Sequence, residues 1–458
     1  MHYVSRIRIL LLLPLLTLGL ALTGCDSGGS SMDDDTDENI DVPSTYTFQS
    51  RFADGESAVA YPGQVTRNLL IADLKFQTDA LGQSGASSTS SLLRRYTENS
   101  ENLSDLDILV PNKFGFEALD SQQNYGDIAT GKSLQGKATS SYADSKTLIG
   151  SADLAITGNS DVTADELIRL YLNRIQSNSQ DDGQLGTPAV YTTDDNVNMS
   201  QLVNKLLLGS VAYSQGTEKY LDDVLDTEAS PNTQDGDNPY STLGHVWDEA
   251  FGYYGAARDF SASGVYYDSD GLLANFDDRN GDGAIDLSSE FVYTWADYSV
   301  DRGVVNDIGF HTELFESFRE GRTAIINQRP LETIRGHAAD ARAAWDRLVA
   351  ANVVHYLNSM AGDLSDLSSD ETVTESSLGE DAALEFNEHW GEAKPFAWAL
   401  QYNPDKQISD AQLQTLHDEL GAAPPYGMTK SEVISKIDAA KGILQSAYGF
   451  PDANMENW

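Results

Sequence analysis

Apolar residues return at helical spacing along most of the chain. Between residues 64 and 80, apolar side chains stand at positions 65, 69, 70 and 74, with charged residues between them. Steps of three and four residues place such side chains on one face of an α-helix. The same pattern predicts further helices over residues 199–221, 241–258, 290–305, 311–327, 331–361 and 382–400.

Capping boxes predict where several helices begin. In a capping box, a Ser or Thr and a Glu or Gln three residues later satisfy main-chain N–H groups that the first helical turn leaves unpaired. Thr163 and Glu166 form one such pair just before an apolar helical face. Two more pairs near the C-terminus are Ser409 with Gln412 and Thr429 with Glu432.

Strand patterns are scarce by comparison. Short stretches at 45–50 and 189–192 are the strand candidates, because a strand requires alternating apolar and polar residues. Residues 97–160 are rich in Ser, Gly and Asp, which predicts long loops with short helices. The predicted fold class is therefore all-α.

The N-terminus has the pattern of an export signal. Arg6 and Arg8 precede an apolar run over residues 9–22, which ends in Leu-Thr-Gly-Cys at Cys25. A basic start, a short apolar core and small residues before the cleavage point are typical of a signal peptide, here residues 1–24. The ending resembles the bacterial lipobox, in which the cysteine is lipidated and becomes the new N-terminus. The alternative is an ordinary signal peptide that ends near a chance cysteine.

The region after the signal predicts a tether and one long domain. Residues 25–45 consist of Cys25 followed mainly by Gly, Ser and Asp, and predict a disordered acidic tether. Cys25 is the only cysteine, so an intramolecular disulfide is excluded. The remainder is long for one simple core. We therefore expect one helical domain over 46–458, built from two packed halves at roughly 46–260 and 261–458.

The net charge limits the kinds of molecule that this protein is expected to bind. The chain has 29 Lys and Arg against 71 Asp and Glu, a net charge of −42, which becomes −44 when Arg6 and Arg8 leave with the signal. Such an excess argues against a nucleic-acid partner and favours attraction of cations. A saline habitat would explain the same excess. We expect attachment to the cell envelope through the lipid, and favour the outer membrane, facing the periplasm or the surface, over the inner membrane.

His245 is the first candidate for chemistry. It precedes Asp248 by three residues and Glu249 by four, so a helix places an imidazole and a carboxylate on one face. Imidazole and carboxylate suit a transition metal such as zinc or iron. The alternative is a core histidine that is hydrogen-bonded to a carboxylate one turn away. A third protein ligand would have to come from another helix.

Further histidines offer weaker patterns. His389 lies three residues before Glu392, and His311 stands at the start of a predicted helix among glutamates. Both are candidate metal ligands, and the alternative for each is a structural histidine. We expect His355 in the core, and His337 and His417 at the surface.

Residues 277–290, DDRNGDGAIDLSSE, resemble a calcium-binding loop. Such loops place oxygen ligands at alternate positions around the cation and use Gly for the sharp turn. Ser289 occupies the position of the usual closing acid, and Glu290 follows one place later. The alternative is an Asp- and Gly-rich turn that caps the next helix. The predicted calcium ligands are Asp278, Asn280, Asp282, Ala284, Asp286 and Glu290.

Four motifs together resemble a known family. They are residues 61–75 (YPGQVTRNLLIADLK), 244–256 (GHVWDEAFGYYGA), 280–290 (NGDGAIDLSSE) and 389–404 (HWGEAKPFAWALQYNP). The combination is similar to a bacterial lipoprotein group, domain-of-unknown-function family number 4856, related to the imelysins. The resemblance implies an all-helical, imelysin-like fold of two bundle-like halves with a site between them. It also implies exposure to the periplasm or surface and a link to iron acquisition.

The chain matches the imelysin motif GxHxxE only in part. Its positions fall on Leu243, His245 and Asp248, while glycine stands at Gly244 and glutamate at Glu249. The function we expect is a non-enzymatic binding lipoprotein in iron or metal uptake or homeostasis, which captures a metal or an uptake partner in the outer membrane. One alternative is a metallopeptidase, and another is an interaction module braced by calcium.

Overall fold

The protein is described by a computed structural model over residues 41–139, 146–151, 162–260 and 275–458. The predicted signal peptide, Cys25 and most of the predicted tether lie outside the described residues. Residues Val42–Trp458 cluster as one compact unit. Within the described part of this unit the structure is all-α, as predicted, and strand-like pairing is limited to isolated bridges.

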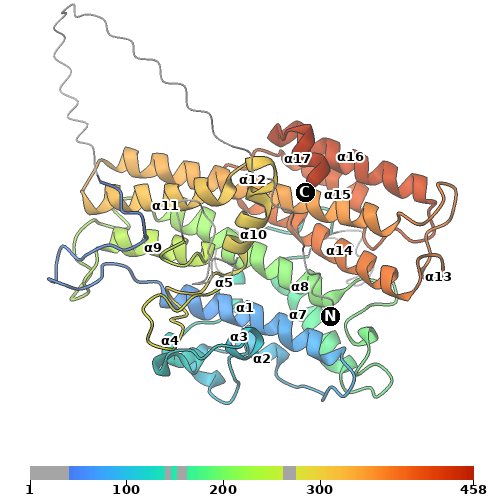
Figure 1. Ribbon diagram of the computed structural model, residues 1–458, viewed down its shortest axis with the longest axis horizontal. Helices are drawn as coiled ribbons and strands as arrows, with labels where there is room; N and C mark the ends of the chain where they lie inside the picture. The colour runs from blue at the N-terminus through green and yellow to red at the C-terminus, as the bar shows by residue number, and fades with distance from the viewer. Residues whose placement is uncertain (1–40, 140–145, 152–161, 261–274) are drawn as a thin grey trace, which may run out of the picture. The chain divides into compact units, whose positions relative to one another are not determined.

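The first part of the unit is built around one long helix, which contacts α2, α3 and α4 (Figure 1). Residues 97–139 form the expected loops with short helices. The elements of this part are α1 (Pro62–Leu81), α2 (Leu92–Thr97), η1 (Ser100–Leu103), α3 (Val110–Phe114), η2 (Asp120–Gln122), α4 (Tyr125–Ile128) and α5 (Gln135–Ala138).

The middle of the chain confirms one capping box and departs from one predicted helix. Thr163 and Glu166 cap the next helix reciprocally. The helix predicted over 199–221 starts as an α-helix but continues in π-helical geometry after Leu207. The elements are α7 (Ala164–Asn178), η4 (Pro188–Val190), α8 (Met199–Leu207), the π-helical η5 (Leu208–Tyr213) and η6 (Gln215–Asp223), and α9 (Thr242–Tyr254).

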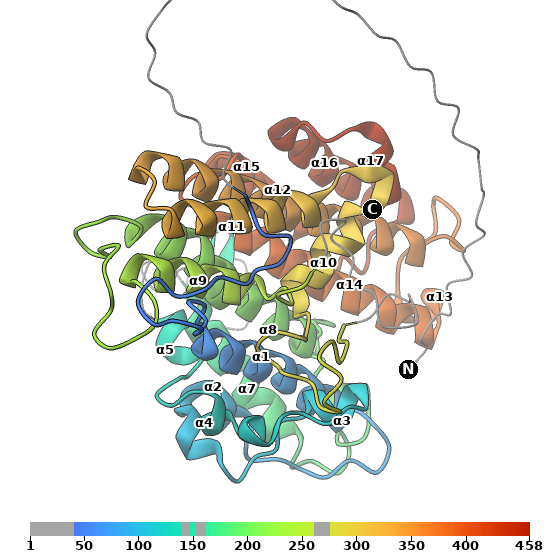
Figure 2. The ribbon, with the colours of Figure 1, turned by 60° about the vertical axis from the view of Figure 1, so that its left-hand side comes forward.

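The last part confirms the remaining helices and the two C-terminal capping boxes. Figures 1 and 2 show α11 and α12 side by side, with α9 against α11. The elements are α10 (Thr294–Gly303), η7 (Val305–Asp307), α11 (Phe310–Ile326), α12 (Leu331–Asp363), α13 (Glu375–Leu378), α14 (Glu380–Ala399), η8 (Leu400–Tyr402), α15 (Asp410–Leu420), α16 (Lys430–Tyr448) and α17 (Asp452–Asn457).

The two strand candidates form no strands. The stretch 45–50 makes a single antiparallel bridge through Gln49, and the stretch 189–192 makes one through Thr192. Pro188 begins a 3₁₀ turn at the second site, where its fixed φ favours a helical turn over an extended one. Neither stretch has a neighbouring strand to continue the ladder, so the alternating pattern has no sheet to join.

One aromatic core joins the two predicted halves. Tyr254 of α9 stacks on Phe318 of α11 at 5.5 Å between ring centroids and meets Trp345 of α12 at 5.8 Å. The ring centroids of Trp345 and Trp295 of α10 lie 6.0 Å apart. Large buried rings dominate core energetics, and here they connect α9 with α10, α11 and α12. The buried apolar residues form one continuous cluster.

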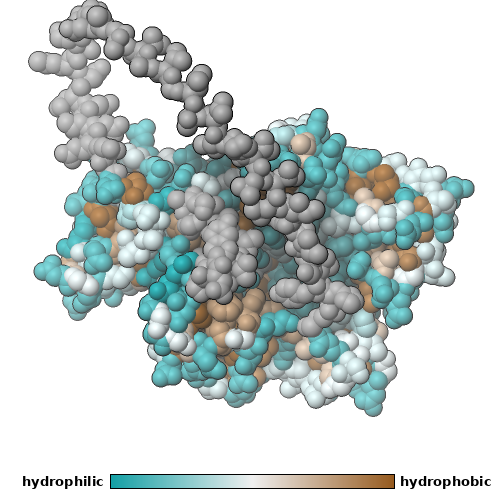
Figure 3. All heavy atoms as spheres, viewed as in Figure 1, coloured by the Kyte–Doolittle hydropathy of each residue, from teal (hydrophilic) through white to brown (hydrophobic). Residues whose placement is uncertain are grey.

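Polar side chains cover most of the face shown in Figure 3, and hydrophobic ones gather there in small patches. Among the helices of the described residues, none is both long and apolar enough to cross a bilayer.

His417 corrects a sequence prediction. It is 2% exposed, although the sequence suggested a surface position. Its helix, α15, buries Leu413, Leu416 and Leu420 on the same side, and this spacing carries His417 into the core. Both ring nitrogens lack hydrogen-bond partners among the described residues. Burial lowers the pKa of His417 well below its usual value, so the ring is neutral in the folded protein.

A His417→Phe variant should show how this ring affects stability. The unfolded imidazole takes up a proton as the pH falls below about 6.5, while the buried ring does not. The wild type should therefore lose stability relative to His417→Phe as the pH falls below about 6.5, by up to ~1.4 kcal/mol per pH unit. Urea unfolding between about pH 5 and about pH 8 measures the difference. His337→Phe, at a half-buried histidine, is the control, and equal pH slopes in wild type and His417→Phe would contradict the prediction.

Candidate functional site

Helix α9 carries the residues that the sequence singled out. Ser241 caps its start through a hydrogen bond from the Gly244 N–H, and Gly255 ends it in the left-handed conformation. His245 and Glu249 are both half-buried, one helical turn apart. Asp248, between them in sequence, is completely buried. The helix therefore divides the predicted trio between a partly accessible face and the core.

Asp248 lies at the centre of a buried ion pair. Arg322 of α11, itself 1% exposed, donates from Nε to Asp248 Oδ1 at 2.8 Å. Tyr46 donates its hydroxyl to the same oxygen at 2.8 Å, and the Ala60 N–H donates to Oδ2 at 3.2 Å. Arg322 also donates from Nη2 to the Ala58 carbonyl at 2.7 Å. Both oxygens of Asp248 thus already have partners within the core.

His245 is held by the same peptide segment. Its Nδ1 lies 2.9 Å from the Ala60 carbonyl oxygen, and its ring stacks on Tyr240 at 4.7 Å between centroids. Because a carbonyl only accepts hydrogen bonds, Nδ1 carries a proton, and in the neutral form of the ring the lone pair lies on Nε2. Metal-binding histidines usually have their second nitrogen fixed in this way. Ala60 therefore links the ion pair, through its N–H, to His245, through its carbonyl.

Glu249 belongs to a polar cluster drawn from three other elements. Its Oε1 accepts hydrogen bonds from Gln64 Nε2 of α1 at 2.9 Å and from the Tyr220 hydroxyl of η6 at 3.2 Å. Lys137 of α5 donates to the same Tyr220 hydroxyl at 3.0 Å. Burial, together with the positive charge of Arg67, lowers the pKa of Lys137 to about 8. A lysine in this range exchanges its proton near neutral pH, and such groups are common where proteins bind or react.

His389 and Glu392 lie on α14 with separate partners. His389 Nδ1 pairs with Asp363 Oδ2 at 2.7 Å, and Glu392 pairs with buried Lys205 at 3.0 Å. Burial tends to lower the pKa of His389, but the hydrogen bond and charge of Asp363 outweigh it and raise the pKa overall. A proton therefore competes with any metal at this ring.

His311 stands at the start of α11 in the core. It is 7% exposed, and its Nδ1 lies 3.3 Å from the Ser299 carbonyl oxygen. Across the ranges that the structure describes, no three His, Cys, Asp or Glu side chains gather as a metal-binding group, and this includes the carboxylates of the predicted calcium loop. The protein donors that α9 offers on its partly accessible face are therefore His245 and Glu249, and their metal-binding role stays a prediction.

The predicted calcium loop folds around its own carboxylates. Asp278 accepts main-chain N–H bonds from Gly281 and Asp282 at Oδ1 and from Gly283 at Oδ2, over 2.8–3.1 Å. Gly281 and Gly283 have φ of 72° and 89°, which glycine adopts without a steric cost. Asp282 in turn accepts from the N–H of Ala284 at 3.0 Å.

Glu290 reaches back into the same loop. Its Oε2 accepts the Asp286 N–H at 3.0 Å and its Oε1 the Asn280 N–H at 3.4 Å. Burial and the charges of Asp286 and Asp278 raise the pKa of Glu290 despite these two bonds. Carboxylates that raise one another's pKa are stabilised when a cation binds between them. Glu290 thus lies against the loop through these two bonds, and its role as a calcium ligand stays a prediction.

Several residues of the α9 region carry no signal in the sequence. Arg322 and Tyr46 bind Asp248 of α9 from segments far along the chain, and Lys137 reaches Glu249 of α9 only through the Tyr220 hydroxyl. A lone arginine, tyrosine or lysine without a motif gives no indication of its partner. Only residue spacing inside one element could be read beforehand, and it correctly placed His245 and Glu249 on one face.

Comparisons with known proteins give one match. A family model described as a domain of unknown function (DUF4856) matches residues 43–397, which is more than three quarters of the chain. The matched range contains α9, the predicted calcium loop and most of α14. Neither the curated proteins nor the solved structures include a match.

Asp248→Asn should reveal how strongly the ion pair holds the fold. The substitution leaves the Arg322 charge buried without a counter-ion, which should cost about 3–5 kcal/mol of the free energy of unfolding. Denaturant unfolding measures the loss. The neighbouring Glu249→Gln is the matched control and should change stability by less than about 1 kcal/mol.

A double variant distinguishes the cost of an unpaired buried charge from the cost of lost contacts. Asp248→Leu with Arg322→Met removes both charges, so it should be less destabilised than Asp248→Asn alone. An Asp248→Asn variant as stable as Glu249→Gln would show that the pair does not hold the core.

Proposed function

The chain belongs to the family described as domain of unknown function DUF4856, and on this premise we propose that it is a lipid-anchored binding protein of the cell envelope. Its ligand is a transition metal such as iron or zinc, or a partner that carries one, and its role lies in metal uptake or homeostasis. The observation that carries this proposal is the geometry of His245. Its tautomer is set by the Ala60 carbonyl, and Nε2 keeps the lone pair that a metal requires.

Glu249 supports the proposal from the same face of α9. One of its oxygens accepts from Gln64 and Tyr220, and no hydrogen bond from a described residue reaches Oε2. Two protein donors leave several positions of a metal's coordination sphere open. Such a site suits a metal that arrives with its own chelating oxygens. Lys137, close to Tyr220, adds a donor and a positive charge for those oxygens.

Hydrolysis is less well supported than binding. A hydrolytic zinc site needs three protein ligands, one open position and a general base. Asp248, at the glutamate position of the GxHxxE motif, has both oxygens bonded within the core. His245 and Glu249 would then have to serve as ligands and base together, so we favour capture over cleavage.

Anchoring and location rest on the sequence. The Leu-Thr-Gly-Cys ending at Cys25 supports attachment through lipid, and two or three acyl chains give stable anchoring where one does not. The net charge of −42 raises the local concentration of cations near the surface. We place the protein at the outer membrane, where an uptake partner in that membrane would receive or deliver the metal.

Calcium is proposed as a structural brace of the same protein. The supporting observation is Glu290, which closes the loop onto both Asn280 and Asp286. The parallel bridge between Ala118 and Ile285 joins the loop to the segment after α3. A cation held by the loop would therefore stabilise the contact between two segments far apart in sequence.

Metal binding is tested on the full chain in detergent. Calorimetry with Zn²⁺, Fe²⁺ and ferric citrate should show binding at roughly micromolar dissociation constants or tighter, the range expected of a capture protein. His245→Ala should weaken it at least about tenfold, since it removes the nitrogen ligand. His337→Ala, a half-buried histidine on α12, is the control. Lack of binding by all three probes, or equal binding in His245→Ala, would rule the proposal out.

Calcium should raise the melting temperature. At a concentration of about 100 times the dissociation constant, binding to the folded state adds roughly 2.7 kcal/mol. Asp282→Asn, at an exposed position, should reduce that gain without changing the melting temperature in chelator. Asp438→Asn on α16 is the control. A melting temperature that does not respond to calcium would argue against the brace.

A further inference from the structure

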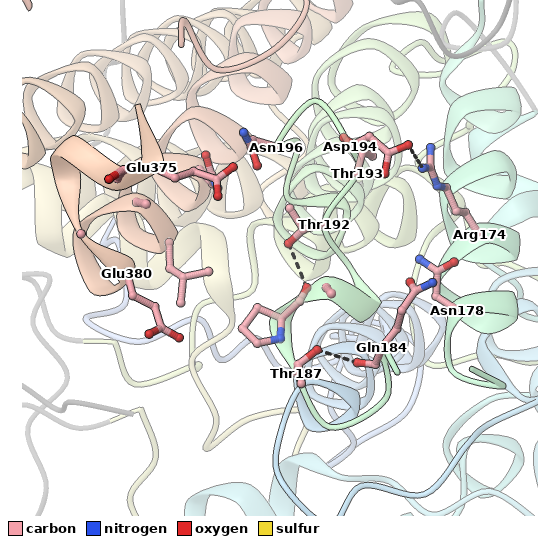
Figure 4. A pocket seen from close by; sticks show the side chains of 17 residues that line it. Arg174, Asn178, Gln184, Thr187, Thr192, Thr193, Asp194, Asn196, Glu375 and Glu380 are labelled. Atoms are coloured by element: carbon pink, nitrogen blue, oxygen red, sulfur yellow. Dashed lines mark hydrogen bonds and ion pairs between the residues drawn. The ribbon is translucent and has the colours of Figure 1, made fainter. Parts of the chain in front are cut away.

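A cleft lies apart from α9, between two segments that the sequence did not connect. Its volume is about 900 Å³, near the upper end of the range for ligand pockets. Figure 4 shows Glu375 and Glu380, at the α13–α14 junction, on one side, and Arg174 and Asn178 of α7 on the other. The segment after η4 lies between the two sides.

Side-chain amides line this cleft. Asn178, Asn196 and Asn387 all contribute to its walls. Asn387 is 4% exposed, and its Oδ1 accepts the Tyr426 hydroxyl at 2.9 Å, which fixes the side chain. Its Nδ2 has no hydrogen-bond partner among the described residues. A buried amide whose donor is unused is a ready partner for a carbonyl oxygen of a ligand.

Carboxylates outnumber the cations in the lining. Asp194, Glu375 and Glu380 lie against a single basic residue, Arg174. Arg174 is already near Asp194, at 3.9 Å. Glu375 and Glu380 are exposed and have no ion pair within the described part of the chain. The cleft thus favours a ligand with positive charges.

Part of the cleft lining is apolar. Pro188 and Ala189 line the cleft from one side, and Ala383 and Leu384 from the other. No aromatic ring stands among the described lining residues, so the stacking that binds nucleobases is not available. Asn178 Nδ2 already donates to the Val190 carbonyl at 3.0 Å, whereas Asn387 keeps its donor. Apolar lining residues, this amide donor and the carboxylates together match an extended chain with amide groups, aliphatic stems and terminal positive charges.

We propose that this cleft binds a basic peptide segment of another protein. The amides of Asn387, Asn178 and Asn196 engage the peptide main chain, and Glu375 and Glu380 bind its Lys or Arg side chains. The chain's own residues 26–45 do not fit, because they carry acidic residues and no Lys or Arg. The peptide site is independent of the metal site, since none of its lining residues lies on α9.

The test measures fluorescence anisotropy of short labelled peptides with the full chain in detergent. A peptide of alternating Lys and Gly should bind saturably. The peptide in which Gln replaces each Lys should bind weakly, and the peptide in which Glu replaces each Lys should not bind. Glu375→Gln with Glu380→Gln should weaken binding by roughly five- to tenfold, as expected for two partly exposed charge pairs. Leu384→Trp should abolish it because the larger side chain fills part of the cleft.

The matched control lies on the same helix. Asp381 and Glu385 are exposed residues of α14 outside the cleft, so Asp381→Asn with Glu385→Gln removes the same charge and should leave affinity unchanged. Affinities are compared only among variants whose melting temperatures equal that of the wild type. Equal weakening in the control pair would attribute binding to overall charge and overturn the proposal.

Two further results would also overturn the proposal. One is binding that persists in Leu384→Trp, which would place the peptide elsewhere. The other is spermidine competing as strongly as the lysine peptide, which would make the site one for small organic cations without use of the amides. Loss of metal binding in His245→Ala with retained peptide binding would keep the two proposals distinct.

Discussion

The buried pair of Arg322 and Asp248 fixes where three segments of the chain meet. Burying one of these charges without the other costs several kcal/mol, so α9, α11 and the segment from Tyr46 to Ala60 must arrive together. The Ala60 peptide group then extends the constraint outward, because its N–H binds Asp248 and its carbonyl binds His245. The candidate metal ligand is thus oriented by the core.

Local signals predicted most of the helices, because those signals act within a few residues. The pair Thr163 and Glu166 forms the predicted capping box, and the long periodic stretches became α1, α11, α12 and α14. The π-helical geometry after Leu207 was not predictable, since apolar spacing does not separate α from π over a short stretch. The surface prediction for His417 was wrong because it rested on the polarity of one residue and ignored the leucines on the same helical face.

The candidate site was predictable only in part. Spacing placed His245 and Glu249 on one face of α9, and the motifs indicated the family. The partners that decide their chemistry come from distant segments: Tyr46 lies 202 residues before Asp248, and Arg322 lies 74 residues after it. Such pairings arise from tertiary packing, which a single sequence does not encode in any local pattern. The cleft could not be predicted for the same reason, since its lining comes from α7, the segment after η4 and the α13–α14 junction.

The aromatic core and the ion pair together determine how much of the chain must be present before the protein can fold. Asp248 of α9 has no counter-ion in the core until Arg322 of α11 is also in place. Tyr254 likewise waits for Phe318 and Trp345. A fragment ending near residue 260 would carry an uncompensated carboxylate toward an apolar interior. The stretch before residue 260 therefore depends on α11 and α12 to complete its core.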